Sequence, residues 1–125
     1  MELRIGPALD SLRALTESGE PPFDLTFLDA DKPPSVEYFE PALRLSHPGS
    51  LIVVDNVVPV GAIAAAGRDD PAIRGMRRLF ERMREEPRVR ATALQTVGSK
   101  EYDGFLLAVV VDPKAPEPGR PDPRR

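Results

Sequence analysis

Apolar residues occur in two kinds of run along the chain, short continuous runs and runs with helical spacing, and the two alternate as in an α/β domain. Leucines at positions 9, 12 and 15 predict a short helix that ends near Gly19. The continuous runs predict strands at residues 2–5, 23–28, 51–54, 91–97 and 105–111. The sequence therefore predicts alternating strands and helices over most of its length.

The composition of the strands predicts how they are arranged. Residues 51–54 are apolar at every position, which is typical of a strand buried on both faces in a parallel sheet covered by helices. The segment 98–104 is too short for a crossover helix, so the strands on either side of it should form an antiparallel hairpin. We expect one mixed sheet in which strands 23–28, 51–54 and 91–97 are parallel. Strand 105–111 should lie antiparallel between the last two of these.

Two further helices have recognisable beginnings. Ser35 can cap a helical segment, in which Pro41 is expected to cause a break or a restart because proline lacks the amide hydrogen. Asp70 followed by Pro71 is typical of an N-cap and a first helical residue. Four apolar residues then share one helical stripe, which we assign to core packing: Ile73, Met76, Phe80 and Met83.

The end of the chain differs in composition from the rest. Residues 112–125 hold five of the fifteen prolines and no aromatic residue. Such a segment buries too little apolar surface to order itself, so we predict a disordered tail. The expected organisation is one domain at residues 1–111 followed by this tail.

Composition excludes several kinds of chemistry. The 125 residues contain no cysteine and one histidine, His47, which is expected in an exposed turn. Disulfide frameworks, thiol catalysis, multi-histidine zinc sites and Ser-His-Asp hydrolysis are therefore set aside. A net charge of -3 argues against a nucleic-acid partner. No apolar stretch reaches the roughly 20 residues of a membrane helix, and the start lacks the features of a secretory signal, so we expect a cytoplasmic protein.

Acidic and amide side chains follow two successive predicted strands. Asp29 comes directly after residues 23–28, and Asp55 and Asn56 come after residues 51–54. Neighbouring parallel strands would bring these side chains together at the carboxyl edge of the sheet, where open α/β sheets bind ligands. Two carboxylates and an amide oxygen are suited to Mg²⁺. For a single residue of this kind, the alternative is a side chain that hydrogen-bonds to the backbone of its own turn. The repetition after two successive strands, with Lys32 nearby, favours a ligand-binding site.

Four segments carry a resemblance to a known family: RIGPAL at 4–9, FDLTFLDADKP at 23–33, EYFEPALRLSHPGSLIVVDNV at 37–57 and VGSKEYDGFLLAVV at 97–110. In this order they resemble the bacterial cation-dependent O-methyltransferases, the group that includes catechol and caffeoyl-CoA O-methyltransferases. The resemblance covers residues 2–111 and implies a Rossmann-like sheet that uses S-adenosylmethionine and Mg²⁺ or another divalent cation.

The resemblance also implies roles for individual residues. It implies that the divalent-metal ligands are Asp29, Asp55 and Asn56. Lys32 matches the lysine that assists deprotonation of the acceptor hydroxyl, with Asp29 beside it in the catalytic group. Asp31 and Ala8 match positions that contact S-adenosylmethionine, Ala8 through its backbone.

This sequence departs from the family in its first half. Family members are about twice as long and carry a glycine-rich loop after their first strand and an acidic residue at the end of their second. Neither feature is found here, so we expect the carboxyl-terminal part of a methyltransferase sheet, without its first two strands, through truncation, a misplaced start or a split gene. Residues 2–5 should then lack their strand neighbours, and the isolated chain should have little activity.

The function expected from these observations is metal-dependent methylation of a hydroxyl group on a catechol-like small molecule. The partners expected are that acceptor and a second copy bound through the exposed sheet edge, with no nucleic acid or membrane. The loop with Lys100, Glu101 and Tyr102 either lines the acceptor pocket or is simply solvated.

Two alternatives stay open. One is a non-catalytic remnant that dimerises or binds a partner. The other is a phosphatase of the haloacid-dehalogenase type, suggested by Asp29 and Asp31 after a strand. It is disfavoured by Pro33, which stands where that family has Thr or Val.

Overall fold

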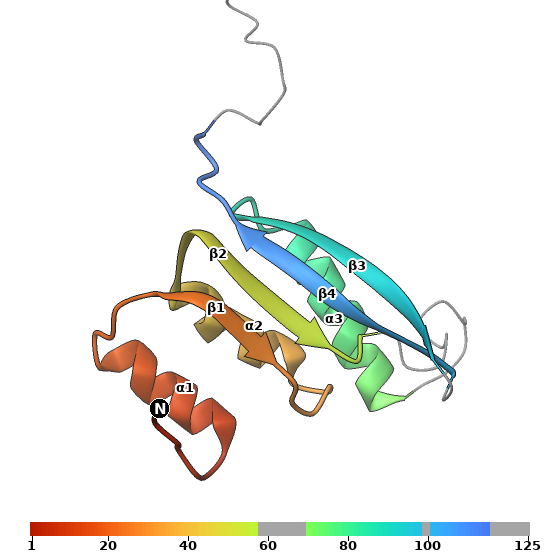
Figure 1. Ribbon diagram of the computed structural model, residues 1–125, viewed down its shortest axis with the longest axis horizontal. Coiled ribbons are helices and arrows are strands. Elements are labelled where there is room, and N and C mark those ends of the chain that lie inside the picture. The colour runs from red at the N-terminus through yellow and green to blue at the C-terminus, as the bar shows by residue number, and fades with distance from the viewer. Residues whose placement is uncertain (58–69, 99–100, 116–125) are drawn as a thin grey trace, which may run out of the picture.

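The computed structural model describes residues 1–57, 70–98 and 101–115 (Figure 1). Its elements, in chain order, are α1 (Ala8–Glu17), β1 (Phe23–Leu28), α2 (Ser35–Arg44), β2 (Ser46–Asp55), α3 (Pro71–Arg84), β3 (Val89–Gly98) and β4 (Glu101–Val110). Each predicted strand after residue 5 and each predicted helix is present. None of the described helices has the length and apolar character needed to cross a lipid bilayer.

The four strands form one sheet in the order β1-β2-β4-β3. β1 and β2 are parallel, and β4 is antiparallel to both β2 and β3. β3 therefore runs in the same direction as β1 and β2, with β4 inserted between β2 and β3. The predicted mixed sheet is confirmed, including the place of the antiparallel strand.

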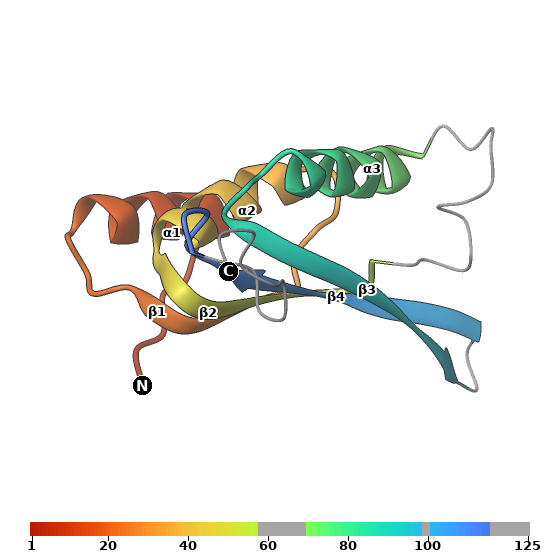
Figure 2. The same ribbon diagram turned by 90° about the horizontal axis from the view of Figure 1, so that it is seen from above.

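All three helices lie on the same side of the sheet, as Figure 2 shows. The core between them and the sheet contains Phe39, Ile52, Met76, Leu79 and Leu106, none more than 1% exposed. The predicted stripe of α3 contributes to this core. Ile73, Met76 and Met83 are buried, and Phe80 is partly buried against the core.

The opposite face of the sheet is not covered by any described helix. Ile52 and Val54 of β2 are buried, whereas Leu51 and Val53 on the other face are only half-buried. The expectation that residues 51–54 are buried on both faces is therefore met on one face only. Apolar side chains remain in contact with solvent on the uncovered face.

Two predictions about helix geometry were wrong. α2 continues through Pro41 without a break, and the Pro41 carbonyl still accepts the Leu45 amide at 2.9 Å. Pro41 leaves the carbonyl of Glu37 without its helical hydrogen bond, but Glu37 is exposed, so water can bond to this carbonyl. The helix is stabilised instead by burial of its apolar face. Ser35 is not the N-cap but the first helical residue, and its hydroxyl donates to the Lys32 carbonyl at 2.6 Å.

Asp70, by contrast, caps α3 as predicted and accepts the Ala72 amide at 2.7 Å. The predicted strand at residues 2–5 is absent. This segment is exposed, with Leu3 at 79% and Ile5 at 92%, because no described strand lies beside it to supply hydrogen bonds.

Three strands are longer than predicted. β2 begins at Ser46, and the turn expected at His47 is a bulge inside it, since Phe23 pairs with Ser46 and Leu25 with Leu51. β3 and β4 extend to the pair Gly98 and Glu101, so five residues of the predicted seven-residue loop belong to the strands and residues 99–100 lie outside the described residues. Residues 113–115 form a turn, and the rest of the predicted tail, 116–125, lies outside the described residues.

Candidate functional site

The carboxyl ends of β1 and β2 lie side by side in the sheet (Figure 1). Leu28 pairs with Val54, so Asp29 and Asp55 follow at the same level on neighbouring strands. Neighbouring strands are about 5 Å apart. Sheet register therefore brings Asp29, Asp55 and the adjacent Asn56 to one edge.

Lys32 joins the loop after β1 to the end of β2. Its ammonium group donates to the backbone carbonyl of Asp55 at 2.7 Å, across 23 residues of sequence. An ammonium has three donor hydrogens, so one is used in this bond and two remain for other acceptors. The contact holds the Lys32 ammonium group at the carboxyl end of β2.

The backbone of Lys32 is itself packed against α3 through Gly75. A Cβ atom on Gly75 would lie 2.1 Å from the Lys32 carbonyl oxygen and 2.8 Å from the Pro33 Cα atom. Real Cβ atoms do not approach backbone this closely, so the contact requires glycine. α3 therefore fixes the position of the loop that carries Asp29, Asp31 and Lys32.

Asp31 is held from α2. The Tyr38 hydroxyl donates to Asp31 Oδ1 at 2.6 Å, and the Tyr38 side chain is buried. Hydrogen bonding to Asp31, with desolvation as a smaller cause, raises the pKa of Tyr38, so the phenol stays protonated and remains a donor. A small pocket beside this pair is lined by Leu28, Ala30, Asp31, Lys32, Ser35, Tyr38 and Val54.

The residue after β2 has an unusual backbone. Asn56 has a φ of 54°, in the left-handed region that asparagine tolerates better than most residues. Its side-chain nitrogen donates to Asp103 Oδ2 at 2.8 Å, and Asp103 Oδ1 accepts the Gly104 amide at 2.7 Å. β4 thus contributes a third carboxylate to the surroundings of the strand ends.

The sequence reasoning missed Tyr38, Asp103 and Gly75. Tyr38 carried one usable signal, because it stands on the first turn of the helix that follows Asp31. Asp103 precedes Gly104 at the start of an apolar run, a pattern that predicts a turn and gives no sign of a binding site. Gly75 is, from the sequence alone, only a residue of low helix propensity inside a helix.

Ala8 is set apart from the other predicted site residues. It is the exposed first residue of α1. Lys100 and the side chains of Glu101 and Tyr102 lie outside the described residues. His47 is in the bulge of β2, where its Nε2 atom lies 2.7 Å from Asp24 Oδ1.

The strand ends offer oxygen ligands to a cation. Among the described residues, no group of three or more His, Cys, Asp or Glu side chains is arranged to share a metal ion. A cation here would therefore depend on Asp29, Asp55 and the amide oxygen of Asn56. This small, all-oxygen set fits a hard divalent ion such as Mg²⁺, which commonly keeps several waters or substrate oxygens.

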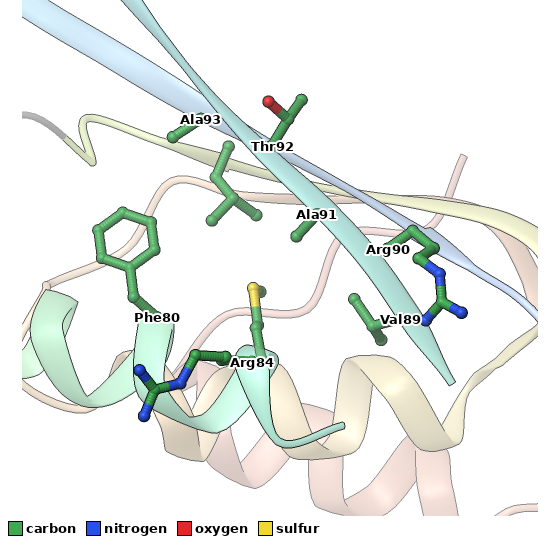
Figure 3. Close-up of a pocket in the computed structure, with 9 residues that line it drawn as sticks. Phe80, Arg84, Val89, Arg90, Ala91, Thr92 and Ala93 are labelled. Carbon is green, nitrogen blue, oxygen red and sulfur yellow. The ribbon is translucent and has the colours of Figure 1, made fainter. Parts of the chain in front are cut away.

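A larger pocket of about 320 Å³ lies between α3 and β3, and Figure 3 shows its lining. Phe80, Ala91 and Leu106 make it mainly apolar, with Arg84 and Arg90 as its charged residues. Its lining contains no carboxylate, and its one hydroxyl is that of Thr92. The residues at the ends of β1 and β2, namely Asp29, Asp55, Asn56 and Lys32, are therefore the better candidate for a catalytic site.

Comparison with known proteins identifies the family of the chain. The model of the O-methyltransferase family matches residues 1–111. Catechol O-methyltransferase of Niastella koreensis is 50% identical over 110 residues, which are 88% of this chain and 50% of that protein. The chain spans about half the length of the curated relatives it matches.

Two solved structures are similar over the same part of the chain. The O-methyltransferase from Bacillus cereus, in complex with SAH, has a TM-score of 0.83 at 53% identity, covering 87% of this chain and 50% of that one. The O-methyltransferase TomG from Streptomyces achromogenes, involved in tomaymycin synthesis and solved with SAM, has a TM-score of 0.80 at 48% identity. That match covers 86% of this chain and 48% of the other.

Proposed function

This chain belongs to the O-methyltransferase family, and on that premise we propose that it takes part in methyl transfer from S-adenosylmethionine to a hydroxyl group. The SAM and SAH bound to two solved relatives support the methyl donor. The name of the N. koreensis relative supports a catechol-like acceptor. Because the chain spans about half the length of such relatives, the proposed activity is that of the whole enzyme to which these residues contribute.

The cation site is the first part of the proposal. Asp29, Asp55 and Asn56 would hold Mg²⁺ or another divalent ion, because the register of β1 and β2 aligns their strand ends. When bound, such a cation lowers the pKa of hydroxyl groups that coordinate it and orients one oxygen. This alignment of oxygen ligands beside Lys32 is the observation that carries the proposal.

Lys32 would accept the proton of the acceptor hydroxyl or stabilise the negative charge on its oxygen. In methyl transfer the acceptor hydroxyl loses its proton to a base and becomes an oxyanion, whose oxygen forms the bond to the methyl carbon as the carbon–sulfur bond breaks. The Lys32 ammonium, held on the Asp55 carbonyl at 2.7 Å, would stabilise the resulting oxyanion with a remaining donor hydrogen. Deprotonated, the same nitrogen would accept the hydroxyl proton.

Asp31 and Ala8 would contact the methyl donor. Tyr38 occupies Asp31 Oδ1 at 2.6 Å, which orients the carboxylate and leaves Oδ2 as the atom to accept a hydrogen bond from the cofactor. Ala8 would contribute its backbone at the start of α1. Holding donor and acceptor in one geometry supplies much of the rate gain in a reaction of this kind.

The second candidate function is a non-catalytic, self-associating protein. Leu25 and Phe27 on β1 are 59% and 58% exposed, and β1 is the last described strand on its side of the sheet. An apolar face next to an unpaired strand edge is suited to association with another chain. The phosphatase alternative is set aside, because the family match is to O-methyltransferases.

Calorimetric titration of the purified protein with Mn²⁺ tests the cation site. Wild type should bind weakly, and Asp55→Asn should bind at least about tenfold more weakly because a carboxylate ligand is lost. Asp112→Asn is the matched control, since Asp112 is exposed and follows the far end of β4. Identical heats for wild type and Asp55→Asn would remove Asp55 from the metal role. Titration with S-adenosylmethionine and turnover of a catechol acceptor with Mn²⁺ then separate the two candidate functions.

A further inference from the structure

The Asn56 side chain hydrogen-bonds to β4, a strand that carries none of the proposed cation ligands. Its Nδ2 atom donates to Asp103 Oδ2 at 2.8 Å, across 47 residues of sequence. Asp103 belongs to β4, whereas the proposed ligands follow β1 and β2. Both partners are half-buried, so the bond is partly shielded from competing water.

This contact fixes which end of the Asn56 amide points where. An ionised carboxylate accepts hydrogen bonds and cannot donate them, so the amide group facing Asp103 must be the NH2 group. The amide oxygen then occupies the other position. A flipped amide would direct oxygen against oxygen at Asp103 and would present NH2 hydrogens to any cation.

Asp103 and the backbone of Asn56 are themselves restrained. Asp103 Oδ1 accepts the Gly104 amide at 2.7 Å, and the Gly104 carbonyl accepts the amide of buried Val57 at 3.0 Å. The Asn56 amide donates to Asp55 Oδ1 at 2.8 Å. These bonds hold Asn56 in its left-handed conformation between β2 and β4 and leave the side chain little freedom.

We propose that Asp103 is a positioning residue for the cation site. It orients the Asn56 amide so that Oδ1, and not the NH2 group, is presented to a divalent cation. The inference rests on the proposed function, because it requires a cation bound by Asn56. Asp103 acts through Asn56 and is not itself a ligand.

A double-mutant cycle distinguishes this role from the simple attraction between Asp103 and a cation. Mn²⁺ affinity is measured for wild type, Asp103→Ala, Asn56→Asp and the double variant. Aspartate at position 56 offers oxygen at both ends and needs no orientation, and it tolerates the same backbone conformation. Asp103→Ala should weaken binding by about 10- to 100-fold with Asn56 present, as other partners of metal ligands do. With aspartate at 56 it should change affinity by less than about twofold, or tighten binding.

A second measurement needs no metal. The two side-chain amide proton signals of Asn56 in the nitrogen-15 NMR spectrum should shift in Asp103→Ala, because the bond to the carboxylate is lost. Asp112→Ala removes the same charge beyond the other end of β4 and should leave these signals and the Mn²⁺ affinity unchanged. If Asp103→Ala fails to fold, Asp103→Ser keeps an oxygen near the Gly104 amide but is too short to reach Asn56.

The outcomes separate this inference from the proposed function. Equal weakening by Asp103→Ala in both backgrounds would mean a charge effect alone and would overturn the positioning role. Unchanged affinity in Asp103→Ala would overturn it too. If wild type itself binds no Mn²⁺, the cation site of the proposed function fails first, and the positioning role falls with it.

Discussion

Gly75→Ala should destabilise this protein, although the same change in most helices is stabilising. Replacing glycine by alanine inside an exposed helix usually stabilises by about 1 kcal/mol. Here the new Cβ atom would lie 2.1 Å from the Lys32 carbonyl oxygen and 2.8 Å from the Lys32 carbonyl carbon. Both atoms belong to the backbone, so α3 and the loop after β1 must move apart.

The magnitude follows from these opposing effects. Overpacking of a close contact costs typically 1–3 kcal/mol, and a clash with backbone atoms is expected near about 3 kcal/mol. Subtracting the gain of about 1 kcal/mol in helix propensity leaves a net loss of about 2 kcal/mol. The displaced loop carries Asp29, Asp31 and Lys32, so Mn²⁺ affinity should fall as well.

Urea unfolding of wild type and Gly75→Ala measures the change, with an unchanged m-value showing that both unfold in the same way. Glu81→Ala, at an exposed position of the same helix, is the control and should change stability by less than about 0.5 kcal/mol. A Gly75→Ala protein that is about 1 kcal/mol more stable than wild type would refute the close contact and the positioning of Lys32 by α3.

Two further predictions concern a buried ion pair and the uncovered face. Arg88 and, to a smaller extent, Arg82 hydrogen-bond to the buried Glu86 carboxylate and lower its pKa to about 2. The ionised carboxylate therefore stabilises the folded state fully above about pH 4.5, and this stabilisation is lost as the pH falls toward 2. Glu86→Gln should therefore cost about 2–3 kcal/mol at pH 7 and flatten the pH dependence of urea unfolding in that window. An equally steep dependence in the variant would contradict the assignment. Phe27→Lys should reduce self-association in light scattering without loss of stability, because Phe27 is 58% exposed on the uncovered face. An unchanged mass distribution would exclude that face as the contact.

The sheet was predictable because its determinants are local in sequence. Continuous apolar runs at residues 51–54 and 105–111 identify strands wherever they lie, and the short segment at 98–104 permits only a hairpin. The first observation gave the strands, and the second gave the antiparallel pairing of β3 with β4. The length of the hairpin was wrong, because cross-strand pairing extended the strands into polar residues that carry no apolar signal.

The contacts that shape the candidate site depend on tertiary packing and could not be predicted in this way. Pro41 stays helical because the buried face of α2 outweighs one missing hydrogen bond. Gly75 gains its importance from Lys32, 43 positions earlier in the chain, and Asp103 gains its importance from Asn56. Sequence patterns report periodicity along one element, and these residues are defined by which other element they meet.

The insertion of β4 between β2 and β3 has a consequence for the order of assembly during synthesis. β4 is the last of the described strands to be synthesised, yet it occupies an interior position in the sheet. Until it arrives, β2 and β3 have no hydrogen-bonding partner between them, and Asn56 has no Asp103 to contact. Such non-local pairing closes a long loop late and slowly. A nascent chain stalled after β3 should therefore expose two strand edges to chaperones or to other chains.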